Sequence, residues 1–284
     1  MRVYLLERIP GVPYSEFRAR PEFADNAREF RERLLGDLAW ALALSFQSRK
    51  SPDSILLLDG TDADTGAGAS RLARGRVGSS LRARLELLEA LPAHAQRHVS
   101  EVARRLDAVE GSPWCLTHGD LVAGNVMVDP ATGHLTGLVD WAEAEWLPFG
   151  VALYGVEEVL GGAGEGPGFA YCAGHEELRR HFWDRLLALS RCGDLGIRPW
   201  LGEVEAARKL GVLLWVGIAF DEGRIDRVIE PGRDEAEMQK LTPFLEAACP
   251  VDAAGDGDRE RGRRGSRVGI WLRELGVAFG QLCR

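Results

Sequence analysis

Hydrophobic side chains recur at steps of three and four positions along much of the chain, which is the spacing of one face of an α-helix. Between residues 22 and 47 this face comprises Phe23, Ala27, Phe30, Leu34, Leu38, Ala41, Leu42 and Phe46. The same rhythm recurs elsewhere. We therefore expect helices over residues 22–47, 80–91, 94–110, 150–161, 175–192, 203–220 and 234–248.

The middle of the chain has a different pattern. Two short β-type runs, NVMVD at 125–129 and LTGLVD at 135–140, are joined by PATGH. Pro130 and Gly133 within the joint are residues that turns favour. This pattern predicts a β-hairpin. The expected fold class is therefore α+β, mainly α-helical, with one central β-hairpin.

Several segments show no hydrophobic rhythm. Residues 59–80 are rich in Gly, Asp and Ser and predict a flexible loop. The IPGVP cluster at 9–13 predicts a turn or linker. Residues 251–267 are polar and Gly-rich, which is typical of a flexible linker. The last segment, 268–284, is expected to form an amphipathic C-terminal helix.

Composition and charge exclude several classes of protein. The 284-residue chain has a formal net charge of -8, which argues against a nucleic-acid partner bound through a basic face. Its five cysteines form no CxxC pair, so neither a disulfide framework nor a zinc site is indicated. It contains no run of about 18 apolar residues and no signal-peptide pattern. We expect a soluble cytoplasmic protein that binds neither nucleic acid nor membranes.

Four residues around the hairpin have side chains suited to phosphoryl transfer. Asp120 precedes Asn125 by five positions, and Asp140 follows the second strand. The hairpin would bring Asn125 and Asp140 to one end, where both could bind magnesium through oxygen atoms. Asp120 could then orient an acceptor hydroxyl and take its proton. A histidine, His118, lies two residues earlier.

The stretch HGDLVAGN, residues 118–125, resembles the H-G-D-x-x-x-x-N catalytic loop of the aminoglycoside phosphotransferase and choline kinase group. These enzymes are relatives of the protein kinases, whose catalytic loop has the same Asp-to-Asn spacing. The resemblance implies that Asp120 is the catalytic base and that His118 is a structural brace of the loop. It also implies Asn125 and Asp140 as magnesium ligands, and ATP as the phosphoryl donor.

The N-terminal stretch VYLLERIPG also resembles this family, at the hinge strand that joins the two lobes and contacts adenine. The resemblance implies a hinge-like segment at 1–14 and a protein-kinase-like C-lobe at 15–250. It also implies adenine contacts from the backbone of three residues: Glu7, Arg8 and Ile9.

The resemblance begins at residue 3 and ends near residue 248. In this family the hinge follows a nucleotide lobe that supplies a phosphate-binding lysine, and the sequence contains no counterpart of that lobe. Two explanations are open: an incomplete gene model, or a genuine short protein with little ATP-dependent activity. The abrupt start within an expected strand favours the first.

The leading hypothesis is an enzyme that transfers a phosphoryl group from ATP to a hydroxyl of a small molecule, with Mg²⁺ as cofactor. One alternative is a catalytically inactive kinase-like binding or scaffold protein. Another is an unrelated helical protein, which requires that the hairpin prediction be wrong. Four glutamates after the hairpin could line an acidic pocket, although solvated helix faces and caps are favoured: Glu143, Glu145, Glu157 and Glu158.

Overall fold

The computed structural model describes residues 8–56, 72–163, 168–190, 196–221, 224–247 and 249. The chain divides into two units, Met1–Pro250 and Val251–Arg284, and every described residue lies in the first. The linker predicted at 251–267 and the helix predicted at 268–284 lie outside the described residues. Most of the loop predicted at 59–80 does so too.

The helices are close to those predicted from the hydrophobic pattern. They are α1 (Tyr14–Phe17), α2 (Pro21–Asp25), α3 (Ala27–Gln47), α4 (Leu81–Leu88), α5 (Ala93–Glu110), α6 (Tyr154–Leu160), α7 (His175–Leu189), α8 (Leu201–Val216) and α9 (Glu235–Glu246). Short 3₁₀ turns lie at Pro52–Ser54, Val151–Leu153 and Arg198–Trp200.

Two predicted helices need correction. The predicted 22–47 helix is interrupted at Asn26, whose extended φ of -130° separates α2 from α3. The predicted 203–220 helix ends at Val216, because Ile218–Asp221 forms strand β10 and pairs with β11 (Arg224–Val228). The apolar residues at the end of this run satisfy a helical pattern and a strand equally well, and the pairing with β11 decides between them.

The predicted hairpin is confirmed as β5 (Val126–Val128) and β6 (Leu135–Leu138), which pair antiparallel. Strand β1 (Val12–Pro13) adds to the free edge of β5 and gives a sheet of order β1-β5-β6. The IPGVP cluster is therefore partly an edge strand rather than only a turn. In the hairpin turn, the Asp129 carboxylate accepts a hydrogen bond from the amide of Ala131, and Gly133 has a φ of +76°.

The hairpin is accompanied by further strand pairs, so the expectation of a single hairpin was wrong. Among the described residues these pairs are β4 (Trp114–Thr117) with β7 (Glu145–Pro148), β8 (Gly161–Ala163) with β9 (Phe169–Tyr171), β10 with β11, and the parallel pair β2 (Ile55–Leu56) with β3 (Leu72–Ala73). Strands of two to five residues are too short for a period of two to stand out in the sequence.

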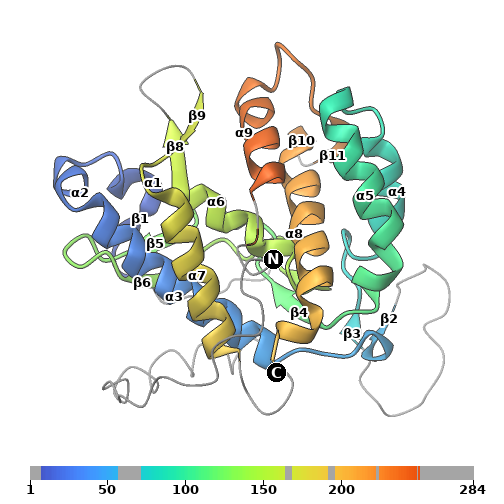
Figure 1. Ribbon diagram of the computed structural model, residues 1–284, viewed down its shortest axis with the longest axis horizontal. Helices are drawn as coiled ribbons and strands as arrows, with labels where there is room; N and C mark the ends of the chain where they lie inside the picture. The colour runs from blue at the N-terminus through green and yellow to red at the C-terminus, as the bar shows by residue number, and fades with distance from the viewer. Residues whose placement is uncertain are drawn as a thin grey trace, which may run out of the picture. The chain divides into compact units, whose positions relative to one another are not determined.

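Two groups of helices surround the central strands. Helices α3 and α7 pack along each other on one side, and α5 packs on α8 on the other. Helix α6 lies between them and touches α3, α7 and α8 (Figure 1). The core contains the largest buried side chains, among them Trp114, Tyr154, Phe46, Phe182 and Phe244. Within the described residues no helix is long and apolar enough to cross a membrane.

The hinge-like segment, where it is described, lies on the hairpin. The Thr136 hydroxyl of β6 donates a hydrogen bond to the Pro10 carbonyl at 2.6 Å. Gly11 has a φ of +103°, and any Cβ there would overlap the carbonyl of Val128 in β5. Ile9 lies so close to Gly137 that a side chain at 137 would collide with it. These contacts place residues 9–13 against β5 and β6, the two strands that lie between the 118–125 loop and Asp140.

Candidate active site

The loop of residues 118–125 connects β4 to β5 and is anchored at a glycine. Gly119 has a φ of +83°, a region that other residues rarely adopt. A Cβ at this position would also overlap the carbonyl oxygen of Glu143. The backbone can therefore turn between His118 and Asp120 only because residue 119 has no side chain.

His118 links this loop to the backbone before Asp140. Its Nδ1 accepts a hydrogen bond from the amide of Asp120 at 3.3 Å, so its Nε2 carries the proton and donates to the Val139 carbonyl at 2.8 Å. Burial lowers the pKa of His118 and so favours this neutral form. The imidazole also lies against the Trp141 ring, with 4.6 Å between the ring centroids. One buried side chain therefore connects two segments that are far apart in the sequence.

Asp120 and Asn125 are joined directly. The Asn125 side-chain nitrogen donates to the Asp120 carboxylate at 2.8 Å and to the Asp120 carbonyl at 2.9 Å. Burial of the Asp120 carboxyl raises its pKa; the Asn125 hydrogen bond and His118 oppose this, while Asp140 and Glu158 add to it. The carboxylate thus accepts a neutral donor, and among the described residues it forms no ion pair.

Asp140 follows β6 at the same end of the hairpin. The amide of Val139 donates to the Asn125 carbonyl at 3.0 Å. This bond brings the backbone of Asn125 next to the residue before Asp140, so the two predicted metal ligands are close in the backbone. Asp140 itself is exposed and has a φ of +60°. It is the one non-glycine residue with a positive φ among those described. Such conformations gather at functional sites, although Asp tolerates this one better than most residues.

The donor atoms here suit a hard cation. The side-chain oxygen of Asn125 accepts no hydrogen bond from the described residues, because the nitrogen of that amide is the atom used towards Asp120. No group of three or more His, Cys, Asp or Glu in the described ranges is arranged to hold a metal. A cation bound by Asn125 and Asp140 would need further oxygens from water or phosphate. That coordination suits Mg²⁺, which keeps waters and shares phosphate oxygens.

The predicted adenine-binding residues are only partly covered. Glu7 lies outside the described residues, whereas Arg8 is exposed and Ile9 is half-buried beside Gly137. Both belong to the segment that packs on the hairpin.

Helix α6 also contacts the 118–125 loop, and sequence reasoning did not identify this contact. The hydroxyl of Tyr154 accepts a hydrogen bond from the amide of Leu121, the residue after Asp120, at 2.8 Å. Tyr154 falls within the helix predicted at 150–161, and nothing in the sequence signals this bond. Leu121 itself is buried against Gly155, where a side chain would collide with it.

Three of the four glutamates considered for a pocket have hydrogen-bond partners from distant parts of the chain. Glu157 forms a bidentate pair with Arg179 at 2.7 and 3.1 Å, and Glu158 pairs with Lys240 at 2.6 Å. The carboxylate of Glu145 accepts two backbone amides, those of Val77 and Gly78. Only Glu143 is exposed. The interpretation as solvated helix faces or caps was therefore wrong for Glu157 and Glu158, which are buried in ion pairs, whereas Glu145 caps backbone amides shortly before α4.

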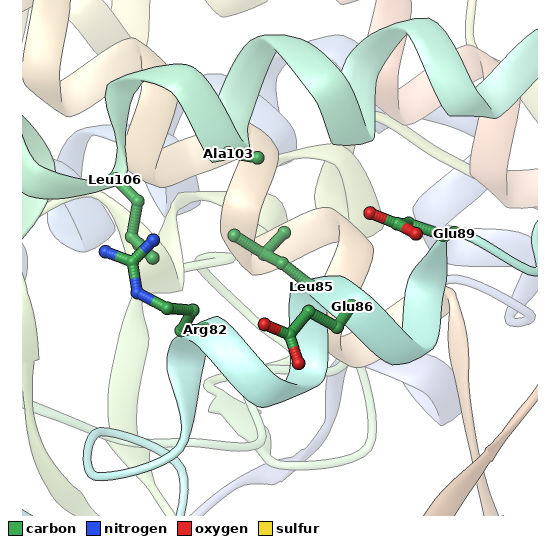
Figure 2. A pocket seen from close by; sticks show the side chains of 6 residues that line it. All are labelled: Arg82, Leu85, Glu86, Glu89, Ala103 and Leu106. Carbon is green, nitrogen blue, oxygen red and sulfur yellow. The ribbon is translucent and has the colours of Figure 1, made fainter.

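A separate pocket of about 200 Å³ lies between α4 and α5 (Figure 2). It is lined by Arg82, Leu85, Glu86, Glu89, Ala103 and Leu106. None of the predicted site residues lines it.

The loop, the hairpin and the acidic residue after it lie within the part of the chain that a family model matches. A family model described as the phosphotransferase enzyme family (APH) matches residues 1–181 of the chain. The match covers more than half of the 284 residues and includes the whole loop and hairpin. The chain belongs to this phosphotransferase family, as the sequence motif predicts. No similar protein was found among the curated proteins.

Proposed function

We propose that this protein transfers the γ-phosphoryl group of ATP to a hydroxyl of a small molecule, with Mg²⁺ as cofactor. Membership of the family supports phosphotransferase chemistry in general. The observation that carries the finer proposal is the pairing of Asp120 with Asn125, with His118 tying the same loop to the residue before Asp140.

Asp120 is the proposed base. Its carboxylate would accept a hydrogen bond from the acceptor hydroxyl and take the proton as the oxygen forms its bond to phosphorus. The bond between that phosphorus and the bridging oxygen of ADP breaks in the same step. The hydrogen bond from Asn125 fixes the Asp120 carboxylate, so the carboxylate needs little reorientation before it accepts the proton.

Asn125 and Asp140 are the proposed magnesium ligands. Their amide and carboxylate oxygens would hold the ion against the phosphates, where it supplies charge neutralisation. The amide geometry favours this role, because the Asn125 nitrogen is turned towards Asp120 and its oxygen away from it. The backbone of Glu7, Arg8 and Ile9 is proposed to contact adenine, since the described part of this segment adjoins the hairpin.

The acceptor is proposed to be a small hydroxyl compound, with no role for nucleic acid or membranes. A cytoplasmic location is also part of the proposal, because ATP is available there. Among the described cysteines, Cys115 and Cys172 are free thiols, which is compatible with a reducing compartment.

The test measures ADP release from Mg-ATP by the purified chain in the presence of a panel of hydroxyl compounds. Asp120→Ala should reduce turnover by about 10²- to 10⁴-fold, the usual contribution of a positioned base. Asp129→Ala is the matched control, because Asp129 lies in the hairpin turn and its carboxylate accepts hydrogen bonds from Ala131 and Thr132 of the same turn. Equal turnover in the wild type and Asp120→Ala would refute the role of Asp120.

Calorimetry with Mg-ATP separates the enzyme from the inactive binding protein. Micromolar binding that weakens in Asn125→Ala and Asp140→Ala supports the proposed magnesium site. A chain that binds no Mg-ATP at millimolar concentration would instead favour the binding or scaffold alternative.

A further inference from the structure

The first two residues of helix α6, Tyr154 and Gly155, contact the candidate catalytic loop at Leu121. The Tyr154 hydroxyl accepts the amide hydrogen of Leu121, which directly follows Asp120. Gly155 provides the space that Leu121 occupies, because a Cβ there would overlap both the side chain and the carbonyl of Leu121. The start of α6 therefore contacts the loop through a polar and an apolar interaction.

Tyr154 is itself held firmly. Its side chain is only 2% exposed, and its ring stacks on Trp215 of α8 with 5.4 Å between centroids and 15° between planes. Burial raises the pKa of the phenol well above its usual value, so the hydroxyl stays neutral. A neutral, immobilised oxygen can accept a backbone hydrogen bond without adding charge beside Asp120.

The other bonds of the loop hold the carbonyl end of this peptide, whereas the Tyr154 hydroxyl holds its N–H end. His118 receives the amide of Asp120, and Asn125 binds the Asp120 carbonyl and carboxylate. The amide of the next residue is the one that Tyr154 binds, so the backbone on both sides of the Asp120 α-carbon is fixed. Loss of the Tyr154 bond would leave this peptide held only at its carbonyl end, by the Asn125 side chain and the Val122 amide, so that its N–H end and the adjoining Asp120 side chain could shift.

We propose that Tyr154 is a positioning residue for phosphoryl transfer, which acts by fixing the peptide after Asp120 from the body of α6 and α8. This inference rests on the proposed function for its effect on turnover. Its geometric part, the fixing of the Leu121 peptide, is independent of that function.

The test compares Tyr154→Phe with Tyr14→Phe. Each variant removes one hydroxyl from a buried tyrosine that bonds a backbone group, but the Tyr14 hydroxyl donates to the Val159 carbonyl in α6 and not to a group of the loop. Hydrogen exchange at the Leu121 amide, followed by NMR, should become about tenfold faster in Tyr154→Phe, as expected for loss of one hydrogen bond. It should be unchanged in Tyr14→Phe.

In the kinetic part, Tyr154→Phe should lower kcat for Mg-ATP turnover about 10- to 100-fold, with KM changed less than about threefold, because misplacement of a reacting group mainly affects the chemical step. Tyr14→Phe should retain the wild-type kcat. Gly155→Ala should act like Tyr154→Phe by displacing Leu121. Gly36→Ala should not, because the nearest atom to its Cβ would be 3.7 Å away.

Unchanged exchange at Leu121 in Tyr154→Phe would overturn the proposal, and so would faster exchange with an unchanged kcat. A wild-type chain without turnover would refute the proposed function instead. The exchange comparison would then decide alone whether Tyr154 fixes the loop.

Discussion

Asp120 and Glu157 are both carboxylates withdrawn from solvent, yet their surroundings differ. Glu157 is 2% exposed, and both of its oxygens accept hydrogen bonds from the guanidinium of Arg179. Burial alone would lower the pKa of Arg179, but Glu157 more than compensates and raises it. Asp120 is half-buried, and its hydrogen-bond donor from the described side chains is the neutral amide of Asn125.

This difference separates a carboxylate that holds the fold from one that is available for chemistry. A buried charge is tolerated when an opposite charge and good hydrogen bonds compensate its desolvation. Glu157 meets that condition, whereas Asp120 has a raised pKa because burial is not offset by a cation. Clefts with such perturbed groups are candidates for functional sites. The two residues should therefore respond oppositely to substitution.

The largest effect is expected at Asp120. Asp120→Asn should lower turnover about 10²- to 10⁴-fold, because an amide cannot take the proton of the acceptor. Its free energy of unfolding at neutral pH should equal or exceed that of the wild type. The raised pKa means that ionisation of Asp120 costs stability once the pH rises above its folded pKa, and the neutral amide removes that cost. Urea unfolding beside an ADP-release assay measures both quantities.

Glu157→Ala should mainly lower the free energy of unfolding, in contrast to Asp120→Asn, which should mainly lower turnover. Removing one partner of a buried ion pair leaves Arg179 uncompensated and should cost about 3–5 kcal/mol of unfolding free energy. The exposed pair of Arg28 with Glu177 is the control, and Arg28→Ala should give no measurable change in the urea midpoint. If Glu157→Ala and Arg28→Ala lower the urea midpoint equally, burial does not distinguish the Glu157–Arg179 pair from the Arg28–Glu177 pair. A fall in stability for Asp120→Asn as large as that for Glu157→Ala would remove the contrast altogether.

A smaller loss is expected at the glycine that begins the loop. Gly119→Ala should destabilise the protein by about 2–3 kcal/mol, because its φ of +83° is unfavourable for alanine and the new Cβ meets the Glu143 carbonyl. Gly124→Ala in the same loop is the matched control, since its Cβ would find its nearest neighbour at 4.0 Å. Thermal unfolding of both variants makes the comparison. If the two shift the midpoint equally, the backbone conformation at 119 is not the cause.

The smallest effect is a dependence of stability on pH. Burial lowers the pKa of His118 in the folded state, so the unfolded chain takes up a proton first as the pH falls below about 6.5. The stability contribution is complete above that pH and is lost on acidification. His118→Gln should reduce the slope of unfolding free energy against pH in this window. His98→Gln should also reduce it, because burial lowers the pKa of His98 too, but should leave turnover unchanged.

Much of the loop could be predicted from the sequence, because its residue spacing and the turn residues of the hairpin are close together in the chain. The spacing of Asp120 and Asn125 is fixed by five peptide units, and the hairpin that carries Asp140 has its own turn residues in Pro130 and Gly133. The long helices followed from apolar spacing, with errors only at their ends. A short strand such as β10 was missed, because its partner β11 and not its own sequence selects its conformation.

The sequence by itself determined the family, the order of the helices and the residue types that the loop offers to a hydroxyl and a cation. The tertiary structure decided which carboxylates are neutralised. Arg179 lies 22 positions from Glu157, and Lys240 lies 82 positions from Glu158. It also decided that Tyr154 holds the peptide after Asp120, across 33 positions. Periodicity reports which face of a helix is buried, but only packing between elements determines which polar group meets another there.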